Sequence, residues 1–212
     1  MKSEQYHFNR IFCVGRNYIN HAKELKNQVP KNPVIFLKPA TCIVNPQTQT
    51  IKKVVGNFEV HFEAELVLLV GKAGYFKEGN NADEFIHAFT LGLDLTLRQL
   101  QNQLKAKGLP WEKSKAFDNS SPLGLMIPVK KLTEIEDFEF SCYVNNAKRQ
   151  HGKVSDMIFS FEEILKEIST YWQLLPGDLI YTGTPQGVGI IQSGDTIRIE
   201  SQQTGSFEWK LE

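Results

Sequence analysis

The chain has no excess of charge of either sign. Its 212 residues carry 24 Lys and Arg against 24 Asp and Glu, so the formal net charge is zero. Proteins that bind nucleic acid through its phosphates depend on a basic surface field, which this composition does not supply. We therefore expect no nucleic-acid partner, and any attraction for an anionic ligand must be local.

Long hydrophobic runs and an apolar leader are also lacking. The longest apolar run is far below the roughly 18 residues that span a membrane, and residues 1–5 contain no signal core. Three scattered cysteines, Cys13, Cys42 and Cys142, form no Cys-x-x-Cys pair. Such cysteines are typical of reduced thiols that pack as small apolar side chains. We expect a cytoplasmic protein without a membrane contact.

Strand patterns outnumber helical patterns along the chain. The length suits one domain with a substantial core, and no repeat, low-complexity segment or linker divides residues 1–212. Strands are predicted at 11–14, 34–39, within 41–55, and at 60–70, 89–96, 123–129, 138–144, 179–182, 196–200 and 206–211. Helices are predicted at 16–25, 81–88, 97–108 and 160–172, and residues 113–117 are expected to be extended. The fold class is α+β, built on mostly antiparallel sheet.

Local cap and turn signals set several of these boundaries. Thr96 with Gln99 and Ser160 with Glu163 each match a capping box, the pattern that opens a helix. Asn145-Asn146 between two strand patterns predicts a hairpin, since Asn tolerates positive φ.

Residues 60–70 join an alternating half to an apolar half. Because strand side chains alternate between faces, His61, Glu63 and Glu65 share one face, with the two carboxylates about 6–7 Å apart. Beside a buried strand they would repel each other and resist desolvation. Mg²⁺ or Mn²⁺, which prefer carboxylate oxygens, would remove both problems. The alternative is a strand end with a solvated polar face.

A second alternating stretch carries another carboxylate. Thr90, Gly92 and Asp94 share the face opposite three leucines. The small neighbours would let a ligand approach Asp94 closely. The alternative is an ordinary polar residue near a helix start.

Residues 16–32 are expected to form a flap, which we call the lid segment. Its helix would begin at an Asn17 N-cap and would place His21 and Glu24 on one face, three residues apart. Such a pair is either a general base with its orienting carboxylate or a surface salt bridge.

A glycine-rich loop follows the strand predicted at 179–182. Residues 183–189, Gly-Thr-Pro-Gln-Gly-Val-Gly, would let backbone N–H groups converge on a carboxylate or phosphate. The alternative is a tight surface loop. The loop lacks the Gly-Lys-Ser/Thr of a phosphate-binding Walker motif.

Six short stretches, taken together and in order, resemble the fumarylacetoacetate hydrolase family. They are Val14-Gly15-Arg16-Asn17-Tyr18 with His21 and Glu24; Phe36-Leu37-Lys38-Pro39; His61-Phe62-Glu63-Ala64-Glu65-Leu66; Leu93-Asp94-Leu95-Thr96 with Arg98 and Gln101; Lys107-Gly108-Leu109-Pro110-Trp111 with Lys115; and Thr182-Gly183-Thr184-Pro185 with Gly187-Val188-Gly189. Independent chance matches multiply, so their joint occurrence favours a metal over a solvated strand end at the two glutamates.

The resemblance implies a fold and a cofactor. The fold would be the family's catalytic domain, a β-rich sandwich or roll with a few helices that commonly forms homodimers. One Mg²⁺ or Mn²⁺ would be held by Glu63, Glu65 and Asp94, which leaves about three octahedral positions for water or substrate. The chain begins near the first core strand, without the extra N-terminal domain of the larger eukaryotic hydrolase, and is similar to the short acylpyruvase-type members.

The resemblance also implies residue roles. Catalytic positions would be His21, Glu24 and Lys115, with Glu24 taking a proton from water through or beside His21, and Lys115 stabilising an enolate. Residues implied to hold substrate oxygens are Arg16, Arg98, Gln101 and Thr184.

The reaction implied first is metal-dependent hydrolysis of a carbon–carbon bond in a small 2-oxo acid, an acylpyruvate, with pyruvate leaving as its enolate. The same enolate chemistry leaves open an oxaloacetate decarboxylase or tautomerase, and an isomerase of the 2-hydroxyhepta-2,4-diene-1,7-dioate type. A non-catalytic protein that binds a metal or a 2-oxo acid also stays open, as does a resemblance of fold alone. The sequence Asn119-Ser120-Ser121 departs from the family pattern and leaves the substrate side chain open.

Overall fold

The computed structural model describes residues 6–24, 28–45, 48–52 and 58–212. The strands are β1 Arg10–Gly15, β2 Val34–Pro39, β3 Ile43–Val44, β4 Thr50–Ile51, β5 Val60–Phe62, β6 Ala64–Val70, β7 Ile86–Leu93, β8 Thr96–Leu97, β9 Ser121–Pro122, β10 Ile127–Pro128, β11 Glu139–Val144, β12 Ala147–Lys153, β13 Leu179–Tyr181, β14 Gly189–Ile191, β15 Thr196–Ser201 and β16 Gly205–Leu211. The α-helices are α1 Ile19–Glu24, α2 Arg98–Ala106, α3 Glu112–Lys115 and α4 Phe161–Tyr171. Most strand pairs are antiparallel, and parallel pairs join β1 to β13, β16 to β4 and β3 to β9. The expected α+β class is confirmed.

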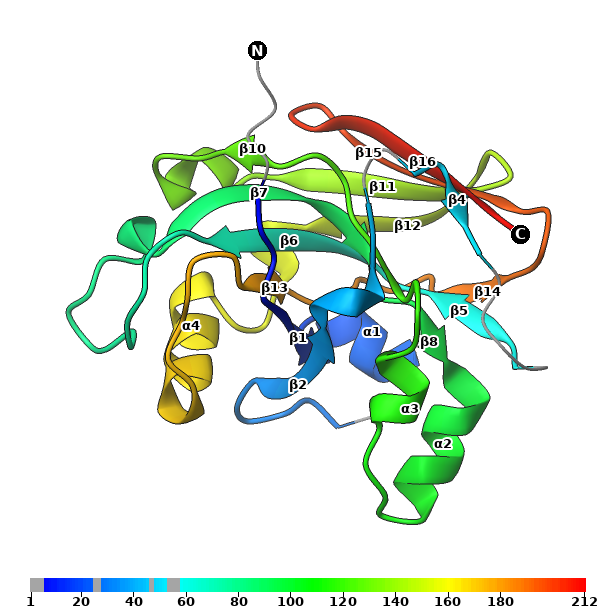
Figure 1. The fold of residues 1–212 in the computed structure, drawn as a ribbon, viewed down its shortest axis with the longest axis horizontal. Coiled ribbons are helices and arrows are strands. Elements are labelled where there is room, and N and C mark those ends of the chain that lie inside the picture. Colours follow the sequence, from blue (N-terminus) through cyan, green and yellow to red (C-terminus); the bar gives the residue numbers. More distant parts are fainter. Residues whose placement is uncertain (1–5, 25–27, 46–47, 53–57) are drawn as a thin grey trace.

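Two sheets form the body of the molecule. A six-stranded sheet has the order β10-β7-β6-β13-β1-β2, and a five-stranded sheet has the order β12-β11-β15-β16-β4. In Figure 1 the five-stranded sheet lies above β6 and β7, while α4 lies below them on the left and α2 with α3 lies at the lower right. A small sheet, β14-β5-β8, lies beside α2 and α3.

Strand β6 is buried along its whole length. Its alternate residues serve two cores, because neighbouring strand side chains point to opposite faces. Leu66 and Leu68 belong to the larger core, together with side chains of the second sheet and α4. Val67 and Leu69 belong to a smaller core on the other face, with Tyr181. A strand packed on both faces is held rigidly, so the residues at the start of β6, including Glu65, are fixed in position.

Helix α1 begins at Ile19, later than the sequence predicts. The expected Asn17 N-cap is wrong: the Asn17 side chain accepts a hydrogen bond from the Phe159 backbone N–H at 2.8 Å and donates one to the Thr182 carbonyl at 2.8 Å. Asn17 therefore ties the start of the lid segment to two distant segments of the fold. Residues 25–27 of the lid segment lie outside the described residues.

The expected capping box at Thr96 and Gln99 is also wrong. Thr96 lies in β8, where it pairs with His61 of β5, and its hydroxyl donates to the Asp94 carbonyl. Sheet pairing has overridden the local helix signal, and α2 starts at Arg98 without a side-chain cap. The segment 113–117, expected to be extended, begins instead within the short helix α3, Glu112–Lys115.

Other local predictions have mixed outcomes. The Ser160 and Glu163 capping box is confirmed at the start of α4. The hairpin is also confirmed, with φ values of 49° and 66° at Asn145 and Asn146. The helix predicted at 81–88 is only the 3-10 turn Ala82–Glu84, because β7 starts at Ile86. Within 41–55, β3 and β4 are found, while residues 46–47 and 53–57 lie outside the described part of the chain.

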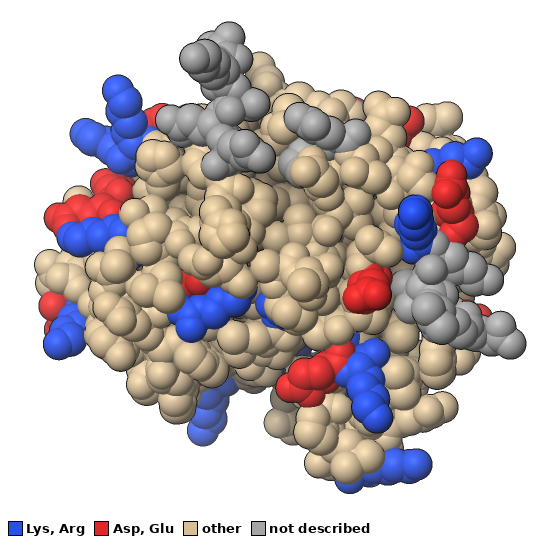
Figure 2. All heavy atoms as spheres, in the orientation of Figure 1, with Lys and Arg blue, Asp and Glu red and all other residues tan. Residues whose placement is uncertain are grey.

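The surface and the thiols match the composition. On the face shown in Figure 2, charged side chains of both signs are interspersed among wide uncharged areas. All three cysteines are buried and free. Among the described residues, no helix has both the length and the apolar character needed to cross a membrane.

Replacing Asn17 by alanine should destabilise the fold. The Phe159 N–H and the Thr182 carbonyl would lose a buried partner, which costs about 1–3 kcal/mol. Urea denaturation followed by circular dichroism would measure this loss. The control is Asn9→Ala, which removes one exposed hydrogen bond to the Pro176 carbonyl and should change stability by less than about 0.5 kcal/mol. Equal effects of the two variants would contradict the anchoring role of Asn17.

Candidate active site

Three carboxylates meet where β6 begins and β7 ends. In the antiparallel β6–β7 pair, Ala64 lies opposite Leu93, so the preceding Glu63 and the following Asp94 are neighbours. The Asp94 N–H donates to the Glu63 carbonyl at 2.8 Å. One carboxylate oxygen from each of Glu63, Glu65 and Asp94 lies within 4.8 Å of the others. Their relative exposures are 5%, 2% and 2%, so the group is almost fully removed from water.

His61 does not join this group. The chain leaves the strand geometry at Glu63, between β5 and β6. His61 lies instead in the small sheet, paired with Ile190 and Thr96. Strand alternation therefore predicts the shared side of Glu63 and Glu65 correctly, but it does not hold for His61.

The pKa values of Glu63 and Glu65 are shifted in opposite directions. Burial, followed by the charges of Asp94 and Glu63, raises the pKa of Glu65 well above its ordinary value. The Gly183 N–H donates to Glu65 Oε2 at 2.7 Å and only partly offsets this. Burial also acts to raise the pKa of Glu63, but the Lys115 ammonium and the Arg98 guanidinium outweigh it and hold that pKa well below its usual range.

Lys115 and Arg98 contact the carboxylate group directly. The Lys115 ammonium lies 2.8 Å from Glu63 Oε2 and 2.6 Å from Asp94 Oδ2. Burial would lower the pKa of Lys115, but Asp94 and Glu63 more than compensate and raise it. Arg98 pairs with Glu63 Oε1 and donates to Gln101 Oε1 at 2.7 Å. Lys115 thus remains a cation at the centre of the site.

Lys38 is a site residue that the sequence reasoning missed. Its side chain is fully buried, and its ammonium lies 2.6 Å from Asp94 Oδ1. It also donates to the Ser120 carbonyl at 2.8 Å and contacts the Ser120 hydroxyl at 3.2 Å. The available signal was a single lysine inside the apolar run of β2, where an unpaired charge would be costly.

The carboxylate group fits a hard divalent cation. Asp94 Oδ1, although close to the Lys38 ammonium, accepts no hydrogen bond of good geometry within the described part of the chain. Glu65 gives one oxygen to the Gly183 N–H, which leaves its other oxygen for a ligand. Burial and the neighbouring charges of Asp94 and Glu63 raise the pKa of Glu65, and a cation bound among the three carboxylates would offset both. Three carboxylate oxygens are the donor set that Mg²⁺ and Mn²⁺ prefer.

Helix α1 places His21 beside the carboxylates. The imidazole is 4% exposed, and its Nδ1 lies 3.4 Å from Glu24 Oε2. Burial lowers the pKa of His21 and so favours the neutral ring. A buried imidazole does not fit a surface salt bridge, so its position favours the interpretation of His21 and Glu24 as a general base with its orienting carboxylate.

The glycine-rich loop binds two carboxylates of the chain itself. The Gly183 N–H donates to Glu65, and the Gly187 N–H donates to both oxygens of Glu24 at 3.1 and 3.2 Å. Gly187 has φ +98°, and a Cβ there would lie 2.0 Å from the Arg149 carbonyl oxygen, so only glycine fits. The predicted carboxylate-binding loop exists, but these two N–H groups bind protein side chains.

Most of the predicted site residues line one cavity. It is a small, partly open cavity of about 40 Å³. Its walls are Val14, Gly15, Arg16, His21, Val34, Phe36, Glu63, Glu65, Asp94, Arg98, Gln101, Lys105, Trp111, Lys115 and Thr184. Of the predicted site residues, Glu24 alone does not line the cavity, and it contacts the cavity residue His21 through a hydrogen bond. The Thr184 hydroxyl already donates to the Ala64 carbonyl at 2.9 Å, so it positions the loop.

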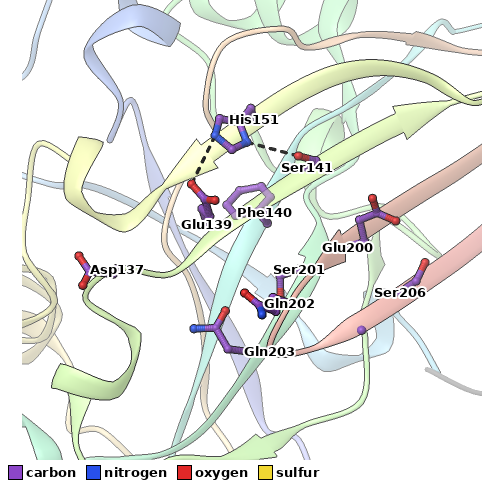
Figure 3. A pocket seen from close by; sticks show the side chains of 11 residues that line it. Asp137, Glu139, Phe140, Ser141, His151, Glu200, Ser201, Gln202, Gln203 and Ser206 are labelled. Carbon is purple, nitrogen blue, oxygen red and sulfur yellow. Dashed lines mark hydrogen bonds and ion pairs between the residues drawn. The ribbon is translucent and has the colours of Figure 1, made fainter.

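A larger cavity of about 590 Å³ lies on the five-stranded sheet (Figure 3). There His151 lies 3.3 Å from the Ser141 hydroxyl and 3.7 Å from Glu139 Oε2. These side chains are partly or largely exposed, and Glu139 also pairs with Lys153 at 2.9 Å. They are ordinary cross-strand contacts on an open surface. Size alone does not make this cavity the site, because among the described residues that line it no charged side chain is buried.

The sequence matches the family described as "Fumarylacetoacetate (FAA) hydrolase C-terminal" over residues 10–212. It is 39% identical over 196 residues to an oxaloacetate tautomerase of Escherichia coli strain K12, covering 92% of this chain and 89% of that protein. It is 38% identical over 189 residues to a mitochondrial oxaloacetate decarboxylase of Dictyostelium discoideum, covering 89% and 87%.

Solved structures agree with the sequence comparisons. A fumarylpyruvate hydrolase from Pseudomonas aeruginosa, in complex with Mn²⁺ and pyruvate, aligns with a TM-score of 0.92 and 32% identity, covering 99% of this chain and 92% of that one. A 5-carboxymethyl-2-hydroxymuconate delta-isomerase from Mycobacterium smegmatis aligns with a TM-score of 0.83 and 34% identity, covering 97% and 79%. The expected fold is confirmed, and the chain belongs to the fumarylacetoacetate hydrolase family.

Proposed function

We propose that this protein is a metal-dependent enzyme that acts on a small 2-oxo acid through an enolate. One observation carries the proposal: a single cavity joins three buried carboxylates, the cation Lys115 and the buried imidazole of His21. The first candidate reaction is enol–keto conversion or decarboxylation of oxaloacetate. The names of the relatives from Escherichia coli and Dictyostelium discoideum support this choice.

The metal ligands would be Glu63, Glu65 and Asp94. Mg²⁺ or Mn²⁺ bound there would supply a Lewis acid for the carboxylate and 2-oxo oxygens of the substrate. The Mn²⁺ in the fumarylpyruvate hydrolase structure supports a metal of this type.

The chain's own residues would handle protons and charge. His21, with its ring held by Glu24 at 3.4 Å, would accept a proton at substrate carbon 3 or return one there. Lys115, kept charged by Glu63 and Asp94, would stabilise the negative charge that grows on the enolate oxygen. Arg16, Arg98 and Gln101 line the cavity and would orient substrate oxygens.

Hydrolysis of an acylpyruvate is the second candidate. It is the reaction that the sequence resemblance implies first, and it stays a prediction. The position of Glu24 behind His21 supports it, since a carboxylate there could help the imidazole remove a proton from water. The fumarylpyruvate hydrolase neighbour, with pyruvate bound, also supports it.

The deciding experiment follows oxaloacetate and acetylpyruvate separately by ultraviolet absorbance, with Mg²⁺ or Mn²⁺ present and pyruvate assayed at the end. Faster enol–keto relaxation without pyruvate indicates a tautomerase, and oxaloacetate loss with pyruvate indicates a decarboxylase. Metal-dependent acetylpyruvate loss with pyruvate indicates a hydrolase. A Glu63→Ala variant is the control for metal-independent reaction. No acceleration with either compound would contradict both candidates.

Replacing Glu65 by glutamine should weaken Mn²⁺ binding by more than the roughly 10–100-fold typical of changes outside the ligands. In a chelator, the variant should be at least as stable as the wild type, because it removes a buried carboxylate that Asp94 and Glu63 also repel. Calorimetric titration with Mn²⁺ and thermal unfolding with and without Mn²⁺ measure both effects. The control is Glu78→Gln, an exposed carboxylate. Unchanged Mn²⁺ affinity in Glu65→Gln would contradict the assignment of Glu65 as a metal ligand.

Replacing His21 by alanine should lower kcat about 10²–10⁴-fold, the usual contribution of a positioned acid or base. Glu24→Ala should lower kcat less in tautomerisation, where it only holds the ring, and as strongly as His21→Ala in hydrolysis. Steady-state kinetics on the reactive substrate measures this. The control is His151→Ala on the distant sheet, which should keep wild-type kcat. If both lid variants keep wild-type turnover, the dyad assignment is wrong.

The assembly and location stay predictions. A homodimer and a cytoplasmic location were expected from the sequence, and the relative from Dictyostelium discoideum is named as mitochondrial. Gel filtration with light scattering should give twice the chain mass of 24.2 kDa if the dimer exists. A mass of one chain would contradict it.

A further inference from the structure

One face of α2 runs along the cavity wall. Arg98, Gln101 and Lys105 are spaced i, i+3 and i+7, so they point to the same side of the helix, and all three line the cavity. Seven residues correspond to about 10 Å along a helix axis. Helical side chains lean toward the N-terminus of their helix, so Lys105 leans back toward the Arg98 end. Lys105 is half-buried, whereas Gln101 and the three carboxylates are buried, so Lys105 lies at the outer part of the cavity.

An aromatic wall holds the Lys105 side chain. Its ammonium lies 4.5 Å from the centroid of the Trp111 ring, a cation–π contact. The Trp111 ring lies 6.3 Å from that of Phe36, and the Lys115 ammonium lies 5.1 Å from the Phe36 ring. A cation–π contact positions a charge but leaves its net value unchanged. Lys105 is thus held in place while its ability to pair with an anion is kept.

The cations of the cavity are not all compensated. Arg98 and Lys115 pair with carboxylates of the site. Arg16 and Lys105 line the same cavity, and among the described residues the ion pairs of the site carboxylates involve only Lys38, Arg98 and Lys115. Burial, together with the charges of Arg16 and Arg98, lowers the pKa of Lys105 to about 8. The amine is still mostly protonated at neutral pH, and the field around it is positive.

We propose that Lys105, together with Arg16, forms an outer anion subsite that binds the distal carboxylate of a 2-oxo dicarboxylate. The inference rests on the proposed function for the inner end, where the 2-oxo acid group would lie. An apolar acyl group at the outer end would leave two half-buried cations without an anionic partner, which is unfavourable. A carboxylate pairs with both of them. The subsite would therefore favour a dicarboxylate such as oxaloacetate over a monocarboxylate such as acetylpyruvate.

A binding experiment tests the subsite independently of turnover. Malate and lactate share a carboxylate next to a hydroxyl, and only malate carries a distal carboxylate. In calorimetric titrations with MnCl₂ present, the wild-type protein should bind malate at least 10-fold more tightly than lactate. Lys105→Gln should reduce this preference to less than about 3-fold, and Lys105→Arg, which keeps the charge, should retain most of it. The control is Lys107→Gln, an exposed lysine at the end of the same helix, which should keep the wild-type preference.

A kinetic arm separates this inference from the proposed function. The kinetic arm follows enol–keto conversion, which both oxaloacetate and its 4-ethyl ester can undergo at carbon 3, while the ester lacks the distal charge and cannot lose CO₂. Lys105→Gln should lower kcat/KM at least 10-fold for oxaloacetate and less than about 2-fold for the ester, mostly through KM. A malate preference lost in Lys105→Gln, without any turnover by the wild type, would support the subsite and contradict the proposed function. No malate preference in the wild type, or an equal loss for both ligands in Lys105→Gln, would overturn the subsite.

Discussion

The structure depends on keeping three carboxylates together out of water. Glu63, Glu65 and Asp94 are almost fully buried, and like charges so close cannot remain ionised without compensation. The Lys115 ammonium pairs with both Glu63 and Asp94, and the Lys38 ammonium pairs with the other oxygen of Asp94, Oδ1. Removing one partner of a buried ion pair typically costs about 3–5 kcal/mol, so these lysines stabilise the fold as well as the site. Glu65 is the member least compensated by cations, which makes it the position where a bound metal would matter most.

Strands β6 and β7 and the glycine-rich loop hold the three carboxylates in place. Strand β6, packed on both faces, fixes Glu65, and its pairing with β7 brings Asp94 beside Glu63. The glycine-rich loop after β13 then binds Glu65 through the Gly183 N–H and Glu24 through the Gly187 N–H. One loop therefore contacts both the buried carboxylates and the end of α1, so a shift of α1 at Glu24 would be transmitted directly to the loop that holds Glu65.

Local pattern predicted some of this site and could not predict the rest. The alternation of residues 60–70 placed Glu63 and Glu65 on one side, and both reach the cavity. The nearness of Asp94 depends on the β6–β7 pairing, a long-range contact that no local pattern carries; only the joint family motifs indicated it. The Thr96 capping box failed because pairing with His61 in the small sheet outweighed a local helix signal. Lys38 and Lys105 were not singled out from the sequence: the one signal for Lys38 was a lone lysine in an apolar strand, and Lys105 lies near the end of a polar helix.

The size of the cavity bears on how the chemistry can occur. A cavity of about 40 Å³ is small beside typical ligand pockets, so a bound 2-oxo acid would widen it. The carboxylates and Lys115 are fixed by buried ion pairs, whereas Glu24 at the end of α1 is a third exposed and is held by hydrogen bonds to Gly187 and His21. The α1 side is thus the less tightly held wall of the cavity, because Glu24 is fixed by hydrogen bonds and not by buried ion pairs. Proton transfer needs no added molecule, whereas hydrolysis must admit one water beside the substrate. Room for a water next to His21, with substrate bound, would therefore favour hydrolysis, and a site without that room would favour proton transfer.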